Sequence, residues 1–181
     1  YNDFALGREA LHKAAKMGSG DAYNLLGCIE YKGFKVERDY EHAKQLFLEA
    51  ERLGNAPALN NLAWLYQHGY GVQPDLVKAV HYYTQSAALG YSSAQCNLGY
   101  LYFHGLGVEK DFAKAFELFR RAVDAENTTA MFNLALLHLD PESGNHDVSR
   151  AVSLLKKCAL AGLAEARDLL QEVQSEEAPR A

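Results

Sequence analysis

The 181-residue sequence is poor in cysteine and has no long hydrophobic run. Its three cysteines, Cys28, Cys96 and Cys158, are too few and too widely spaced for the framework of a disulfide-stabilised secreted domain. We therefore expect small buried thiols, and from them a cytoplasmic protein kept in a reducing compartment. No segment approaches 18 consecutive apolar residues, so we expect no insertion into a membrane.

Positive charge is also scarce, because 18 Lys and Arg stand against 23 Asp and Glu and give a formal net charge of −5. Nucleic-acid binding needs a basic face that displaces counterions, so nucleic acid is not an expected partner. Hydrophobic residues make up 49% of the chain, which excludes disorder of the whole. The sequence begins at Tyr1 and not at Met, so we expect it to be a trimmed piece of a longer protein.

What the sequence has in abundance is a repeat with a period of 36 residues. We call a set of residues that stand 36 positions apart a column. One column has a small residue in every repeat, from Gly7 to Ala151, and a glycine column that begins at Gly18 is interrupted only by Glu126. Three further columns are Ala22, Ala58, Ala94, Ala130 and Ala166; Leu26, Leu62, Leu98, Leu134 and Leu170; and Asp39, Asp75, Asp111 and Asp147. Such a period indicates stacked supersecondary units.

Each unit is predicted to contain two helices. In the second unit Pro57 suits a first helical turn, and apolar residues then recur at helical spacing up to Gly69 and Gly71, which end the helix. Asp75 follows at the N-cap position of a second helix, and Gly90 ends that helix. One such pair cannot bury its apolar face alone, whereas a stack of pairs can.

The expected fold is therefore all-α, a right-handed α–α superhelix (solenoid) of about four to five 36-residue helix–turn–helix repeats. The array is expected over residues 1–173, and 174–181, which are polar, are expected to be a disordered tail. Partial helices are expected at 3–17 and 165–173. The full repeats are 21–56, 57–92, 93–128 and 129–164.

The third unit resembles a Sel1-like repeat, a relative of the tetratricopeptide repeat. The resemblance is carried by residues 94–102 (AQCNLGYLY), 105–108 (GLGV) and 111–115 (DFAKA), and it recurs four times. Two units depart from the pattern: Lys35 stands where a loop glycine belongs, and residues 140–146 lack both glycines at their usual places. We expect irregular loops at both positions.

The resemblance implies a scaffold or adaptor whose first helices line a concave, partner-binding face. Aromatic, amide and histidine side chains dominate the positions so exposed, with Lys32 as one charge among them, and this composition suits a protein or peptide partner. The candidate residues are Asn24, Tyr31, Asn60, Asn61, Trp64, Gln67, His68, Asn97, Tyr100, Phe103, His104 and Asn133. A basic clamp for a terminal carboxylate is missing.

A purely structural role competes with binding at several of these positions. Asn61, Asn97 and Asn133 form one column and are expected to bond to a neighbouring helix or turn. Trp64 and Tyr100 share another column that would equally serve packing between repeats. Histidines 68 and 104 with Cys96 do not make up the three or four converging ligands of a metal site, so no metal or cofactor is expected.

Catalytic motifs are missing as well, because no Ser or Cys stands in a recognisable arrangement with a base and an orienting carboxylate. We therefore expect a non-enzymatic interaction module, not an enzyme. Two alternatives stay open: a regulatory or localising repeat domain of a larger enzyme or complex, and self-assembly through an open end of the array.

Overall fold

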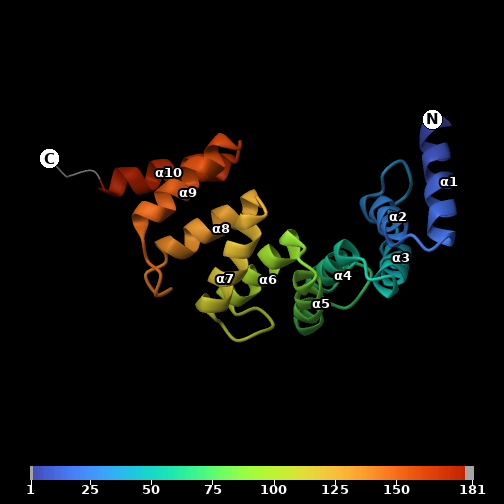
Figure 1. The fold of residues 1–181 in the computed structure, drawn as a ribbon, viewed down its shortest axis with the longest axis horizontal. Coiled ribbons are helices and arrows are strands. Elements are labelled where there is room, and N and C mark those ends of the chain that lie inside the picture. The colour runs from blue at the N-terminus through green and yellow to red at the C-terminus, as the bar shows by residue number, and fades with distance from the viewer. Residues whose placement is uncertain (1, 178–181) are drawn as a thin grey trace. The chain divides into compact units, whose positions relative to one another are not determined.

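A computed structural model describes residues 2–177 of the chain, and within that range it contains helices and no strand (Figure 1). First helices of the repeats alternate with second helices, as the periodicity predicts. The helices are α1 (Asn2–Lys16), α2 (Gly20–Lys32), α3 (Tyr40–Arg52), α4 (Ala56–His68), α5 (Leu76–Ala88), α6 (Ser92–His104), α7 (Phe112–Asp124), α8 (Thr128–Leu139), α9 (Val148–Leu160) and α10 (Ala164–Glu177).

The chain divides into two units, one ending at Ala94 and the other beginning at Gln95. In the first unit α2 packs on α3 and α4 on α5, and in the second α8 packs on α9 (Figure 1). The all-helical repeat architecture predicted from the sequence is confirmed. The expected tail is corrected in part: α10 continues to Glu177, so 174–177 are helical, and 178–181 lie outside the described residues.

Each second helix begins at the aspartate that the sequence singled out. The Oδ1 atoms of Asp39, Asp75, Asp111 and Asp147 each accept a hydrogen bond of 2.9–3.0 Å from the backbone N–H three residues later. These bonds satisfy donors that an uncapped helix would leave free. The interpretation of this column as N-caps is confirmed.

The first helices have caps that the sequence analysis overlooked. Ser19, Asn55 and Asn127 accept hydrogen bonds from the backbone N–H groups of Ala22, Ala58 and Ala130. The helix predicted from Pro57 therefore begins at Ala56, with Asn55 as its N-cap and Pro57 in its first turn. These caps also stand 36 residues apart in the sequence. The column was overlooked because its polar residues are of two types, serine and asparagine, and because Tyr91 interrupts it.

Within residues 2–177, two residues other than glycine adopt the left-handed backbone conformation. Lys35 has a φ of 56°, close to the 65° of Gly71 one repeat later, and Glu126 has a φ of 58° in the glycine column. The irregular loop expected at Lys35 is therefore wrong, because the lysine adopts the conformation of the missing glycine. The loop at 140–146 does differ: the C-cap of α8, Asp140, has an extended conformation, whereas the C-cap of α4, Gly69, is left-handed.

Large side chains of the second helices fill the interior against small residues of the first. Phe47 and Phe119 are 2% and 1% exposed, and a Cβ added at Gly27 or Gly99 would lie 2.6–2.7 Å from the respective ring. The two glycines therefore make room for the two phenylalanine rings. Where the first helix has Ala135 instead, the smaller Leu155 occupies the corresponding buried position.

Candidate functional site

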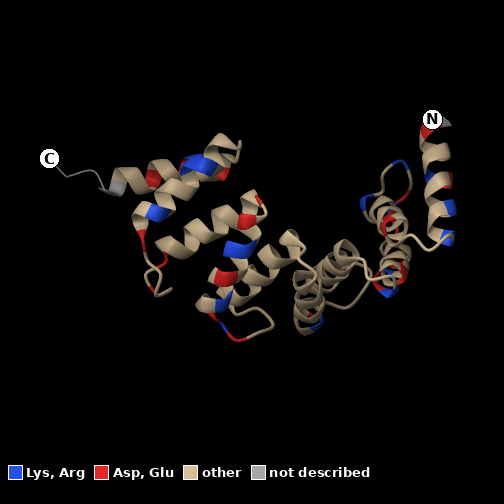
Figure 2. Cartoon of the chain, in the orientation of Figure 1, with Lys and Arg blue, Asp and Glu red and all other residues tan. Residues whose placement is uncertain are grey.

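The first helices of the central repeats carry no formal charge. Helices α4, α6 and α8 contain neither Lys, Arg, Asp nor Glu, while the second helices and the loops carry many (Figure 2). These three helices would therefore contact a partner through amide and aromatic side chains and not through charged groups.

In the first unit the amide of Asn61 links α4 to α2. Its Nδ2 donates to Asn24 Oδ1 at 2.9 Å and to Cys28 Sγ at 3.5 Å. In the second unit Asn133 Nδ2 likewise donates to Cys96 Sγ at 3.5 Å. Both amides therefore hold a first helix to the preceding one, which is the structural role that the sequence analysis set against ligand binding.

An aromatic cluster surrounds Trp64, which is 37% exposed. Its Nε1–H donates to the Tyr31 hydroxyl at 2.9 Å, and its ring lies 3.8 Å, centroid to centroid, from the ring of His68. His68 stacks on Tyr70 at 5.7 Å, and Tyr70 in turn contacts Tyr31 at 6.0 Å. These contacts fix the orientation of the rings while leaving Trp64 and His68 accessible.

A hollow lies beside this cluster, and we call it the Cys28 hollow. It measures about 130 Å³ and is lined by Cys28, Tyr31, Lys32, Phe47, Asn61 and Trp64. Burial raises the pKa of the Cys28 thiol above its ordinary value, so the thiol is neutral near pH 7. The sequence analysis had placed Tyr31, Lys32, Asn61 and Trp64 on the first-helix face, and it had treated Cys28 as a buried thiol. Phe47 reaches the hollow from α3.

The second unit presents Tyr100, 40% exposed, whose ring lies 4.3 Å from that of His104. Phe103 is half-buried and packs edge-on against Phe112 at 5.5 Å. Burial, and to a lesser extent the nearby charge of Lys110, lowers the pKa of His104 below 6.5. His104 is therefore neutral near pH 7 and acts as an aromatic surface group.

The remaining predicted residues have intermediate exposure. Gln67 accepts a hydrogen bond from the Tyr83 hydroxyl at 2.9 Å, so its carbonyl oxygen is engaged with α5. Asn60 and Asn97 are half-buried on α4 and α6. The structure thus places the twelve candidates on first helices, seven in the first unit and five in the second.

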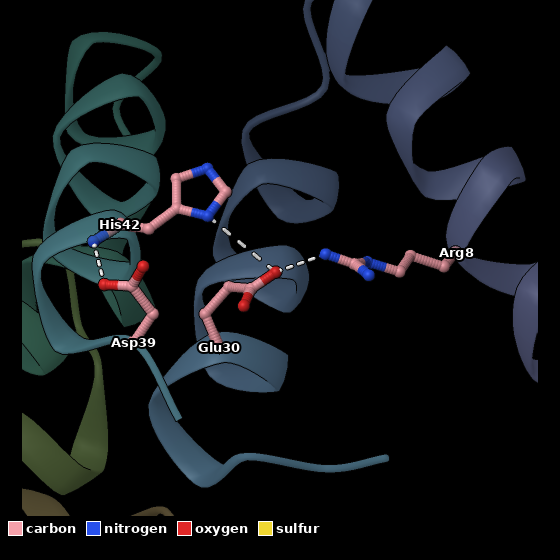
Figure 3. Close-up of polar contacts among 4 residues, drawn as sticks. All are labelled: Arg8, Glu30, Asp39 and His42. Atoms are coloured by element: carbon pink, nitrogen blue, oxygen red, sulfur yellow. Dashed lines mark hydrogen bonds and ion pairs between the residues drawn. The ribbon is translucent and has the colours of Figure 1, made fainter. Parts of the chain in front are cut away.

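Sequence analysis missed a charged contact at the N-terminal end. Glu30 is 5% exposed, and its Oε1 lies 2.5 Å from Arg8 Nη2 on α1 and 3.8 Å from His42 Nδ1 on α3 (Figure 3). His42 also donates its backbone N–H to the Asp39 cap. The sequence did contain a signal for this contact: Glu30 is an acidic residue in a column whose other members are Tyr66, Tyr102 and His138.

The cysteines are free thiols: Cys96 and Cys158 are buried, and Cys28 is half-buried. Burial raises the pKa of Cys96 to about 11. Among the described residues there is no group of three or more His, Cys, Asp or Glu placed to hold a metal ion. Within the same range, every helix is too short or too polar to cross a bilayer.

Four consecutive segments, 20–55, 56–91, 92–127 and 128–163, match the model of the Sel1 repeat. A Sel1 repeat protein from Oxalobacter formigenes has a TM-score of 0.80 and 30% identity over 93% of this chain and 72% of that one. The protective antigen c5321 of uropathogenic Escherichia coli has a TM-score of 0.81 and 25% identity over 94% of this chain, which spans 37% of that protein. Helicobacter pylori cysteine rich protein B has a TM-score of 0.56 and 25% identity, over 68% of this chain and 93% of that one. No curated protein matches the chain.

Proposed function

Because the chain belongs to the Sel1 repeat family, we propose that it is a non-enzymatic module that binds a segment of a partner protein on its first helices. Sel1 repeat proteins are generally protein–protein interaction modules, and the family is typically a non-catalytic scaffold. The proposal adds the binding surface and the kind of partner to that general role.

One observation supports this surface above all: the uncharged helices α4 and α6 each expose a large aromatic residue beside a histidine. Trp64 and Tyr100 are 37% and 40% exposed. Exposed, oriented aromatic rings give large contact area for little loss of conformational entropy, and they are enriched where proteins bind partners. Each unit therefore offers its own first-helix surface to a partner segment.

The experiment is a selection of binding peptides from a displayed library of random 12-residue sequences. The wild-type chain is expected to enrich a limited set of peptides, and Trp64→Ala/Tyr100→Ala is expected to weaken their binding at least tenfold. Lys156→Ala/Lys157→Ala, on exposed positions of the second helix α9, is the matched control and is expected to bind like the wild type.

Circular dichroism checks that all variants keep the same helix content. Equal peptide binding by the wild type and the aromatic double variant would move the site away from the first helices. Failure of the wild type to enrich any peptide would overturn peptide binding as the function of this module.

A further inference from the structure

We propose that the Cys28 hollow is a specificity pocket that takes one Leu or Ile side chain of a partner peptide, next to an Asp or Glu that pairs with Lys32. This inference rests on the proposed function and specifies the peptide chemistry that the first unit recognises. All residues that carry it belong to that unit.

The hollow exists because one position of the repeat is unusually small. Cys28 belongs to a column whose later members are Trp64, Tyr100 and Leu136. A side chain of that size at position 28 would occupy the space between Tyr31, Asn61 and Trp64. The first repeat therefore leaves open a volume that corresponding side chains fill elsewhere.

The size of the hollow selects among apolar side chains. An apolar cavity of about 150 Å³ holds one benzene ring, so a volume of about 130 Å³ suits the smaller side chain of Leu or Ile. The Phe47 ring, 2% exposed, forms part of an apolar lining, and the neutral Cys28 thiol adds a weakly polar wall. Burial of an aliphatic side chain there is favoured by the hydrophobic effect.

The walls are held in place before a ligand arrives. Trp64 donates to Tyr31 at 2.9 Å, and Asn61 donates to Asn24 and to Cys28. A partner side chain therefore enters a site whose ring orientations are already fixed, which lowers the entropy cost of binding.

Lys32 supplies the charge preference at the rim. It lines the hollow, is exposed at the end of α2, and lies outside ion-pair distance of every described Asp and Glu side chain. An acidic residue next to the buried Leu or Ile would give this ammonium a partner, whereas a basic residue would be repelled. One cation is too few for a terminal-carboxylate clamp but sufficient for one acidic side chain.

The test uses three variants of the full chain and the displayed library of random 12-residue peptides. Cys28→Leu fills the hollow with the side chain that the column itself contains at Leu136. Cys28→Ala, the control, leaves the hollow open, and Lys32→Glu reverses the charge at its rim.

The wild type and Cys28→Ala are expected to enrich peptides with Leu or Ile within two positions of Asp or Glu. Cys28→Leu is expected to bind the enriched peptides roughly tenfold to hundredfold more weakly, the loss that accompanies one unburied aliphatic side chain. Lys32→Glu is expected to keep the aliphatic preference, lose the acidic one, and bind acidic peptides about two- to fivefold more weakly.

Trp64 is the sole tryptophan of the chain and lines the hollow, so its fluorescence gives an independent binding signal. An enriched synthetic peptide is expected to shift the Trp64 emission to shorter wavelength, and its Leu→Ala version is expected not to.

Three results would overturn the inference. If Cys28→Leu binds the peptides as tightly as Cys28→Ala, the hollow is not the pocket. If the wild type enriches peptides without an acidic preference, Lys32 has no such role. If enriched peptides lose affinity in Tyr100→Ala but not in Cys28→Leu, the module still binds peptides while this pocket fails, which separates the inference from the proposed function.

Discussion

Glu126 occupies a backbone conformation that suits glycine better than any other residue. Its φ of 58° corresponds to values of 74° and 84° at Gly54 and Gly90 in the same column. For a residue with a Cβ, the left-handed conformation costs roughly 1–2 kcal/mol. Glycine avoids this cost but loses about 0.5–1 kcal/mol more conformational entropy on folding. The stacking of the repeats tolerates this strain.

Replacing Glu126 by Gly is expected to raise the free energy of unfolding by about 0.5–1 kcal/mol, because the strain is released. Urea denaturation followed by circular dichroism measures the change. The reciprocal variant Gly54→Ala is expected to lower stability, since an added Cβ there meets open space and only the backbone conformation opposes it. A destabilised Glu126→Gly would contradict the strain.

At single positions, residues of the same type in every repeat could be predicted from the sequence, whereas a contact made in one repeat alone was missed. The Asp caps and the glycine ends stand in columns and were found, whereas Glu30 was overlooked because its partner Arg8 lies 22 residues away. The sequence analysis did not predict that Phe47 lines the Cys28 hollow, because the contact of this ring with the first helix depends on the missing Cβ of Gly27.

Among the helices, α1 is attached in an unusual way. Its Ala15 packs with Ala22, Leu26 and Leu46, but the same interface also contains the ion pair between Arg8 and the buried Glu30. A buried carboxylate that loses its cation is costly, because it has already given up its hydration. The ion pair therefore fixes α1 onto α2.

Arg8→Ala is expected to destabilise the docking of α1 by about 1–3 kcal/mol, because Glu30 keeps only His42 nearby at 3.8 Å. Hydrogen exchange is expected to become faster in α1 before it changes in α5. Lys13→Ala is the control, since its ion pair with Glu9 is exposed and contributes at most about 0.5 kcal/mol. Equal exchange in both variants would remove any special role of Arg8.

The N-caps of α5 and α7 make the stability of the fold depend on pH in the acid range. The backbone N–H of Lys114 lowers the pKa of Asp111 below its ordinary 3.8, and Lys78 acts in the same way on Asp75. A carboxylate with a depressed folded-state pKa stabilises the fold above the unfolded value. That stabilisation is lost as the pH falls below 3.8 through the folded value.

Asp111→Asn is expected to reduce the loss of stability below pH 3.8, because an asparagine caps the helix but does not titrate. Asn55 and Asn127 show that this residue caps helices in the same array. The measurement is the urea midpoint of wild type and variant from pH 6 to pH 2.5. Parallel pH profiles would show that the Asp111 cap does not contribute to acid unfolding.

The ends of the helices could be predicted only where the same sequence signal occurs in every repeat. The order of first and second helices follows from the apolar spacing, but the end of α8 does not, since 140–146 lack the usual glycines. There the backbone N–H of Glu142 bonds to Asp140, and the ring of the buried His138 bonds to the carbonyl of Asn145. This local network replaces the glycine turn and has no counterpart in the other repeats from which to infer it.

At the scale of the whole chain, α10 departs from the small-residue column of the other first helices. Gln171 of α10 is exposed and occupies the column of Gly27, Ala63, Gly99 and Ala135, where every full repeat has a small residue. In the first repeat the small residue of this column, Gly27, makes room for the ring of Phe47. Gln171 therefore departs from the small-against-large packing of the first repeat.

Stability is expected to depend on where the array is damaged, because each repeat contacts only its neighbours. Leu62 is fully buried in the core formed with Ala43, Phe47 and Leu65, whereas Leu170 is half-buried on α10. Leu62→Ala is expected to lower the free energy of unfolding by about 2–5 kcal/mol, and Leu170→Ala by less. Hydrogen exchange should accelerate in α3 and α5 for the first variant and only near α9 and α10 for the second. Equal losses, with exchange accelerated over the whole chain in both variants, would mean that the chain unfolds as one cooperative block and not repeat by repeat.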